Sequence, residues 1–575
     1  MAARLTTYLV VGIVAATLIA GLIVGAQRDD SEGPVDLIVH NAVVYTGDDE
    51  TMAEAVAIRG NQVLRVGSNR EITRLRRPQT TMIDAGGAAV LPGFNDGAVR
   101  LVEGGLALRE IDLLGARTSA EIFGRIRTWA SANPNADWVL GRGWSPAAGE
   151  GEVTRQELDA IVADRPVFLL SETGDEAWVN SRTLAVAGVT AGTRDPGDGA
   201  VVRDRRTGEP TGLLTGSAVQ LASKHVPRPT RDDRAAALRD AIDEAHRLGI
   251  TSVQDVGATT ADVALYDELR KTDDLDLRVY AALAVETPAD ERALARLEAV
   301  WRQYSDDPRL KTGAVAIELD GRVEEQAAAL LSPYRDTGSG GESRLAADDL
   351  NRLARLLDAQ GWQVLTRATG DRAVRMALDA YRHAARSNPV PERGRRHRID
   401  GLALVDPADV PRFDALDVLA STQPFFLDPS PARLVAWNAI LGPERALAAW
   451  PLKTLAARGT RVVFGSGWPT APLNPMLGLH TAVTRTTMTG QPENGWTPGE
   501  RISLATAIDA YTSQGAFASF DEQRKGTIAT GMLADLVVLS NDIFDTPPAR
   551  LAGASVAVTI FDGRIVYRRE ARATN

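Results

Sequence analysis

The sequence contains no cysteine and only six histidines among its 575 residues. The absence of cysteine excludes disulfides, thiolate metal sites and cysteine nucleophiles. No two histidines lie within five residues of each other, so the sequence offers no closely spaced histidine pair for a metal ion. We interpret all six as structural rather than catalytic: His40, His225, His246, His383, His397 and His480.

Positive charge is also in short supply. The 64 lysines and arginines are outnumbered by 75 aspartates and glutamates, which gives a net charge of -11. This balance argues against nucleic acid as a partner, because phosphate neutralisation needs a basic face. Hydrophobic residues make up 44% and charged residues 24%, which is ordinary for a globular protein and excludes wholesale disorder.

Charged residues are absent from one long N-terminal stretch, residues 5–26. Its apolar or small part, 9–26, has the length of a slightly tilted transmembrane helix. Arg4 precedes it and an acidic stretch follows, so the positive-inside rule places the N-terminus in the cytoplasm. We predict an uncleaved anchor over 1–30 in the cytoplasmic (inner) membrane, with the body periplasmic. The alternative is a cleaved signal peptide ending near Ala26.

Short alternating strands occur at both ends of the body. They run over 34–67 and again over 533–569, where Asp562-Gly563 is a hairpin signal. We predict that 31–90 and 520–575 form one composite β-sandwich.

Between these ends, apolar strands alternate with amphipathic helices, which predicts an α/β fold with a (β/α)8 barrel over 91–519. Asp371 is predicted to cap a helix and Gly361 to end one. The strand candidates are Val90–Asp96, Val167–Glu172, Ile250–Gly257, Leu277–Val285, Ala314–Asp320, Gln363–Thr369, Arg398–Leu404, Val418–Pro424 and Arg461–Gly467, and the helix candidates are Asp233–Leu248, Ala289–Trp301, Ala346–Gln360 and Asp371–Ser387.

A series of motifs occurs in order along the body, among them VDLIVHNAVVYTGD, IDAGGAAVLPGFNDGAVRL, GWQVLTRATGDRAVRMALDAY, RHRIDGLALVDPADVPRF and GTIATGMLADLVVLSNDIF. With these motifs the chain resembles the amidohydrolase superfamily, in particular its type-3 branch of metal-dependent hydrolases. The resemblance covers nearly all of the chain after the predicted anchor. It implies a barrel with a sandwich, and one or two divalent metals at the C-terminal ends of the barrel strands that activate water for attack on an amide.

The positions that this resemblance assigns to metal binding and proton transfer carry other residues here. In the family motif Gly-Phe-x-Asp-x-His-x-His, the two histidines are Ala98 and Arg100 here, and the histidine of Gly-His-x-x-Trp is Asp175. The lysine of Val-Lys-Ile-x-x-Asp-Gly is Ala316, and the histidine of His-Ala-x-Gly-Asp is Arg367. The histidine of Arg-Ile-Glu-His is Gly401, and the aspartate of Gly-Ser-Asp-Trp-Pro is Gly467.

These replacements remove lone pairs from the site. Alanine and glycine offer no ligand atom, and arginine is a permanent cation that repels a metal ion. We therefore predict no catalytic residue, no metal and no cofactor. The remaining residues of the vestigial site are predicted to be Asp96, Trp144, Asp320, Asp371, Asp400 and Trp468.

The leftover acidic residues have three interpretations. Asp96 and Asp371 each lie four residues from an arginine, so we expect ion pairs of Asp96 with Arg100 and of Asp371 with Arg367, since an unpaired buried arginine is costly. The alternatives are a carboxylate site for Ca²⁺ or Mg²⁺ and a metal-free acid/base pair. The two tryptophans either pack at the barrel mouth or line a pocket for an anion between the two arginines.

Together these observations predict a pseudoenzyme: a membrane-anchored, extracytoplasmic accessory or structural subunit of a larger membrane complex. Its partners would be the lipid bilayer, through 5–26, and the other subunits, with respiratory and photosynthetic assemblies as candidates. Two alternatives stay open. One is a protein that binds a small anion in the former active site, and the other is an active amidohydrolase with relocated metal ligands.

Overall fold

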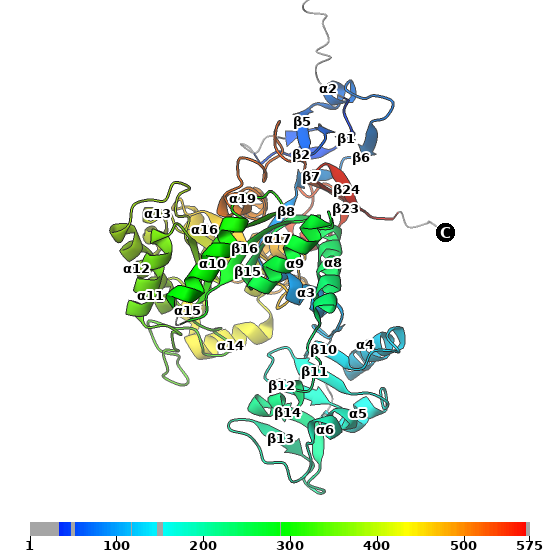
Figure 1. Ribbon diagram of the computed structural model, residues 1–575, viewed down its shortest axis with the longest axis vertical. Coiled ribbons are helices and arrows are strands. Elements are labelled where there is room, and N and C mark those ends of the chain that lie inside the picture. The colour runs from blue at the N-terminus through cyan, green and yellow to red at the C-terminus, as the bar shows by residue number, and fades with distance from the viewer. Residues whose placement is uncertain (1–33, 48–51, 117, 146–152, 288, 571–575) are drawn as a thin grey trace, which may run out of the picture.

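A sheet of eight parallel strands forms the centre of the molecule (Figure 1). The computed structural model describes residues 34–47, 52–116, 118–145, 153–287 and 289–570. All neighbouring pairs in this sheet are parallel, as predicted for a barrel. Around the sheet the strands are β8 (Phe94–Val99), β15 (Ile250–Ala258), β16 (Arg278–Ala284), β17 (Leu310–Glu318), β18 (Gln363–Arg367), β19 (Arg398–Asp400), β20 (Leu419–Thr422) and β21 (Val462–Phe464).

The two edge strands, β8 and β21, meet through the backbone that follows them. The Gly467 amide donates to the Ala98 carbonyl at 2.8 Å, and the Arg100 amide donates to the Trp468 carbonyl at 2.9 Å. Val99 and Trp468 form a parallel bridge at this point. A Cβ atom on Gly97 would lie 2.7 Å from the Phe464 carbonyl oxygen, so glycine lets the two backbones come together. The sheet thereby approaches a closed barrel.

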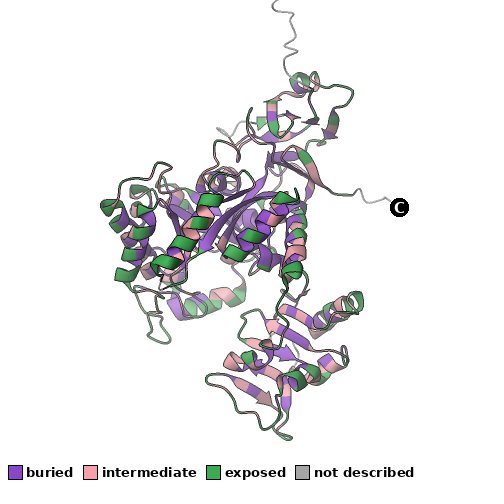
Figure 2. Cartoon of the chain, in the orientation of Figure 1, coloured by how far each residue is buried: buried purple, intermediate pink, exposed green. Residues whose placement is uncertain are grey.

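Helices surround the outer side of the sheet, and several of them, such as α11 and α12, have one buried and one exposed face (Figure 2). In α12 the buried stripe includes Val374, Leu378 and Tyr381. The helices of this part are α3 (Leu101–Leu108), α8 (Arg231–Arg247), α9 (Thr260–Lys271), α10 (Glu291–Gln303), α11 (Ala347–Ala359), α12 (Asp371–Ser387), α13 (Val410–Ala415), α14 (Pro431–Leu441), α15 (Pro443–Ala446), α16 (Leu452–Ala456), α17 (Pro475–Thr484), α18 (Leu504–Ala510) and α19 (Ser513–Ala518), with 3-10 turns η3 (Pro424–Leu427) and η4 (Pro498–Glu500).

The predicted end of α11 is correct, whereas the predicted cap of α12 is wrong by one residue. Gly361, at φ 86°, follows the C-cap of α11. Gly370 is the N-cap of α12, and Asp371 is the first residue of the helix. The Asp371 carboxylate accepts from the Leu331 amide at 2.8 Å and from the Arg372 amide. It therefore ties a preceding loop to the helix instead of capping it.

Two further sheets pack face to face at the N-terminal end of the barrel. One has the strand order β5-β4-β1-β6 and the other β24-β23-β22-β7-β2-β3, so the second contains strands from both ends of the chain. Their shared core includes Val39, Val56, Leu536 and Ile560. The elements are β1 (Leu37–His40), β2 (Val43–Tyr45), β3 (Met52–Ala53), β4 (Ala55–Arg59), β5 (Gln62–Gly67), α2 (Asn69–Thr73), β6 (Thr81–Asp84), β7 (Ala89–Pro92), β22 (Leu536–Leu539), η5 (Pro548–Gly553), β23 (Val556–Phe561) and β24 (Arg564–Arg568).

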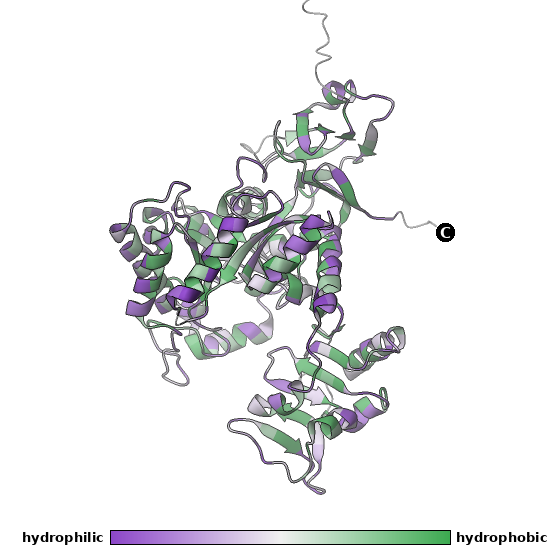
Figure 3. Cartoon of the chain, in the orientation of Figure 1, coloured by the Kyte–Doolittle hydropathy of each residue, from purple (hydrophilic) through white to green (hydrophobic). Residues whose placement is uncertain are grey.

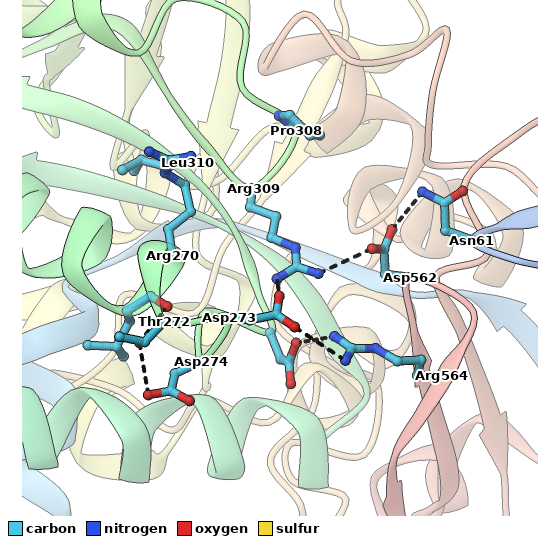
Figure 4. Close-up of polar contacts among 12 residues, drawn as sticks. Asn61, Arg270, Thr272, Asp273, Asp274, Pro308, Arg309, Leu310, Asp562 and Arg564 are labelled. Atoms are coloured by element: carbon cyan, nitrogen blue, oxygen red, sulfur yellow. Dashed lines mark hydrogen bonds and ion pairs between the residues drawn. The ribbon is translucent and has the colours of Figure 1, made fainter.

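An ion-pair network joins this sandwich to the barrel. Arg278, which begins β16, is buried and donates to Asp535 at 2.6 Å and to Asp562 at 2.9 Å. Figure 4 shows the outer part of the network, where Arg309 reaches both Asp273 and Asp562. Although burial opposes its charge, the paired carboxylates raise the pKa of Arg278. The sandwich is thus held by buried charges that satisfy one another.

A third sheet lies between α3 and α8 in the chain and forms a separate body next to the barrel (Figure 1). This insertion was not anticipated, and the strand candidate Val167–Glu172 belongs to it as β11 rather than to the barrel. Its strand order is β13-β14-β12-β11-β10-β9. Its elements are β9 (Ile111–Asp112), α4 (Ser119–Ala132), β10 (Val139–Trp144), α5 (Arg155–Asp159), β11 (Val167–Ser171), β12 (Glu176–Val179), α6 (Ser181–Ala187), β13 (Ala200–Arg203), β14 (Pro210–Thr215), η2 (Gly216–Ala218) and α7 (Val219–Ser223).

Hydrophobic residues concentrate on the strands of the barrel and of the other sheets, while the helices are mixed (Figure 3). Among the described residues, no helix combines the length and the apolar character that a membrane crossing requires. The predicted anchor at 5–26 lies outside the described residues.

Candidate functional site

The C-terminal ends of the barrel strands bring several of the predicted site residues to one rim. Glu318, Arg367 and Asp400 are register partners on the neighbouring strands β17, β18 and β19. Arg100 follows β8, and Gly467 follows β21. This rim is where barrel enzymes place their catalytic groups, so its residues decide what the protein does chemically.

Asp96, on β8, is fully buried beneath the rim. Its Oδ1 atom accepts from the amides of Ala98 at 3.1 Å and Ser466 at 2.8 Å. Its Oδ2 atom has no hydrogen-bond partner among the described residues. Burial raises the pKa of Asp96 to about 7, against the opposing hydrogen bonds from Ser466. The predicted Asp96–Arg100 ion pair is absent from the described structure, because the carboxylate points inward to the backbone that joins β8 to β21.

Arg100 pairs instead with Glu318, a residue that the sequence analysis did not single out. Its Nη2 atom lies 3.0 Å from Glu318 Oε1. Arg344 reaches Glu318 Oε2 at 2.6 Å, and Arg367 Nη1 lies 3.6 Å from Oε1. We call Arg100, Arg344 and Arg367 the rim arginines. Glu318 follows Ala316 by two residues on β17, so strand alternation places both on one face, and this spacing was the signal that would have identified it.

Asp320 and Asp371 hold loops in place. Asp320 is fully buried and accepts from the amides of Thr369, Gly370 and Ala329 at 2.8–2.9 Å. Burial raises the pKa of Asp320, and these amides oppose the shift. The predicted Asp371–Arg367 pair is wrong, because Asp371 turns toward the Leu331 amide while Arg367 turns toward Glu318.

Asp400 is occupied by neighbouring side chains. Its Oδ1 atom accepts from Ser421 Oγ at 2.5 Å and from Gln423 Nε2 at 3.1 Å, and Arg398 Nη2 lies 3.4 Å away. Arg398 itself is fully buried and also donates to Gln254 at 2.6 Å. A guanidinium therefore already neutralises this carboxylate inside the barrel.

Neighbouring side chains take up the space around the two substituted glycines. A Cβ atom on Gly467 would lie 3.1 Å from the Phe426 ring and 3.3 Å from Gln423 Cγ, and this glycine has φ 74°. A Cβ atom on Gly401 would meet Arg367 Cγ at 3.4 Å. Any larger side chain at Gly467 would require its neighbours to move.

The two predicted aromatic site residues are both core residues. Trp468 packs its ring on Gly104 of α3, where an added Cβ would lie 2.0 Å from the ring. Trp144 is fully buried in the insertion, where its indole N–H donates to the Leu169 carbonyl at 2.9 Å. Asp175 is also in the insertion, on an exposed loop beside Thr173. The insertion therefore holds two predicted site residues that the sequence assigned to the barrel mouth.

The residues at the rim do not fit a catalytic metal. Within the described ranges, no three histidine, aspartate or glutamate side chains are grouped to hold a metal ion. His397 is buried, with Nε2 3.1 Å from Asp358 and Nδ1 accepting from the Val364 amide. Burial lowers the pKa of His397, against the effect of Asp358. These contacts agree with a structural role for this histidine.

Comparison with known proteins decides the family. A family model described as Amidohydrolase family matches residues 81–567. The chain belongs to this family. It is 31% identical to Protein LONG AFTER FAR-RED 3 of Arabidopsis thaliana, over 92% of this chain and 91% of that protein. It is 26% identical to an N-substituted formamide deformylase of Arthrobacter pascens, over 93% of this chain and 98% of the enzyme.

The fold is shared with a solved metal-dependent hydrolase. A crystal structure of an uncharacterized metal-dependent hydrolase from Pyrococcus furiosus superposes with a TM-score of 0.68 at 26% identity, over 87% of this chain and 98% of that one. The eight parallel strands thus belong to a fold that metal-dependent hydrolases use.

Proposed function

We propose that this chain is a non-hydrolytic amidohydrolase that acts as an accessory subunit at a membrane. The observation that carries the first part is Gly467, which stands where the family has its aspartate and where a Cβ atom would already lie 3.1 Å from the Phe426 ring and 3.3 Å from Gln423 Cγ. Alanine at 98 and 316 and arginine at 100 and 367 offer a dication no lone pair at these four positions. Without a metal, water keeps its ordinary pKa and is a poor nucleophile.

The second part is supported by residues 5–26, a charge-free apolar stretch of sufficient length to cross a bilayer. A large folded body on a single membrane anchor, with a barrel that has lost its metal ligands, is the organisation that we expect of a structural subunit. A respiratory or photosynthetic assembly is the kind of complex we propose.

Membrane fractionation followed by purification in mild detergent tests this role. We expect the full chain in the membrane fraction, and then in a particle much larger than its own 61.4 kDa. The double variant Val14→Arg/Leu18→Arg adds about 5–7 kcal/mol to the insertion cost and is expected in the soluble fraction.

The matched control is Val435→Arg on α14, at a side chain that is already 70% exposed, and it is expected to fractionate like the unmodified chain. Recovery of the chain only as a monomer would contradict the accessory role. Retention of the double variant in the membrane would contradict the anchor.

A hydrolase with relocated ligands is the competing function, favoured by the name of the Arthrobacter pascens relative. It requires a new ligand set, and the described residues contain no grouping of three candidate ligands. The anion-binding alternative has a specific observation behind it, the rim arginines, and is developed next.

A further inference from the structure

The three rim arginines converge on a single carboxylate from three different segments of the chain. Arg100 directly follows β8, Arg344 lies in the long loop after β17, and Arg367 is the last residue of β18. All three reach Glu318, at 3.0, 2.6 and 3.6 Å. We infer that this rim binds a small oxyanion, a carboxylate or a phosphate, between Arg100 and Arg367. The inference rests on the proposed function, because it needs a rim that no metal occupies.

The rim arginines have hydrogen-bond capacity to spare. Each guanidinium carries five N–H donors. In the described part of the chain, the side chains of Arg100 and Arg344 each donate one hydrogen bond, to Glu318, and the Arg367 side chain donates none. Their side chains are 50%, 57% and 38% exposed, in the order Arg100, Arg344 and Arg367. A ligand from solvent can therefore reach donors that the protein does not use.

Three guanidinium groups gather at the rim, although the chain as a whole is negative. The three guanidinium groups face Glu318 and the exposed Glu103, which lies 3.6 Å from Arg100. Of the nearby buried acids, Asp400 pairs with Arg398, whereas Asp320 is held by backbone amides and still acts on Arg367 through its charge. Among the side chains that reach solvent at the rim, three guanidinium groups face two carboxylates, and this excess attracts an anion.

Glu318 shows which chemical group fits. Arg100 and Arg367 approach the same atom, Glu318 Oε1, so one small group can contact both. Guanidinium groups match carboxylates and phosphates in geometry and bind them with two parallel hydrogen bonds. Phe426 and Gln423 fill the space beside Gly467, which favours a ligand on the rim over one deep in the barrel.

Isothermal titration calorimetry on the full chain in detergent, after treatment with a chelator, tests the site. Inorganic phosphate and succinate are the two probes, titrated in separate experiments. We expect saturable binding of at least one probe, weakened at least about tenfold by Arg100→Gln or Arg367→Gln. Glu318→Gln removes the competing carboxylate and is expected to tighten binding by roughly tenfold. Arg352→Gln, at an exposed pair with Asp349 on α11, is the matched control and is expected to leave binding unchanged.

The two probes separate the two sources of the oxyanion: tighter binding of succinate assigns a carboxylate ligand, and tighter binding of phosphate assigns a phosphate ligand. Binding of neither probe would overturn the inference, as would binding that Arg100→Gln and Arg367→Gln leave intact. Because the chain is free of metal in this experiment, its failure leaves the proposed function standing. Metal retained by the untreated chain would instead overturn the proposed function, whatever the anions do.

Discussion

Gly105→Ala is expected to lower the free energy of unfolding by about 3 kcal/mol, because it overpacks a helix contact. Gly105 lies on α3, the helix whose N-cap is Arg100. A Cβ atom there would lie 1.9 Å from the carbonyl oxygen of Ala237 on α8. The obstacle is backbone rather than a flexible side chain, so the two helices would have to separate. Urea denaturation followed by tryptophan fluorescence and by circular dichroism measures the change.

The control is Gly124→Ala on α4, which is also a glycine inside a helix. Nothing lies within 4 Å of the Cβ atom that this substitution adds. Alanine is the better helix former, so we expect unchanged stability or a gain of up to about 1 kcal/mol. Equal losses from both substitutions would show that close helix packing is not what Gly105 provides.

Arg278→Met is expected to destabilise the protein by about 3–5 kcal/mol, because it leaves buried charge without its partner. Arg278 and Asp535 are 5% and 4% exposed, and Asp562 is 18% exposed. Methionine keeps most of the apolar stem but offers no donor to either carboxylate. Differential scanning calorimetry is the measurement, and the loss is expected in the transition of the sandwich and barrel together.

An exposed arginine provides the comparison for this second effect. Arg231 pairs with Glu268 at side chains that are 72% and 40% exposed, so Arg231→Met is expected to cost at most about 1 kcal/mol. If Arg278→Met also lowered the free energy of unfolding by no more than about 1 kcal/mol, the buried pairs of Arg278 and the outer pairs in Figure 4 would not be what holds the sandwich on the barrel.

The architecture of the barrel could be predicted from the sequence because its signals are local. Apolar strands alternate with amphipathic helices such as Asp371–Ser387, and the hydrophobic period of each segment can be read from the sequence itself. The insertion escaped prediction for the same reason. Val167–Ser171 has the apolar composition of a barrel strand, and only its pairing with β10 and β12 assigns it to another sheet. Pairing of this kind is a non-local property.

The candidate site, too, could be predicted from the sequence only in part. The loss of lone pairs follows from residue identity alone, at positions such as Ala98 and Gly467. The ion pairs did not follow, because proximity in sequence was a poor guide to proximity across the sheet. Arg367 lies four residues from Asp371, yet it reaches Glu318 on the neighbouring strand, which is its register partner. Side chains at a barrel rim meet across strands, and the register that brings them together is fixed by the whole barrel.

Metal content is the most direct test of the central claim, which is that this amidohydrolase barrel has lost its metal centre. The full chain, expressed with zinc in the medium and dialysed against metal-free buffer, is analysed by inductively coupled plasma mass spectrometry. We predict far less than one zinc per chain. We also predict no gain with Gly467→Asp, because one carboxylate does not replace the ligands missing at positions 98, 316, 367 and 401, and because its Cβ atom would lie 3.1 Å from the Phe426 ring. One or two zinc ions retained per chain, and lost on substitution of Asp96 or Asp400, would contradict the account.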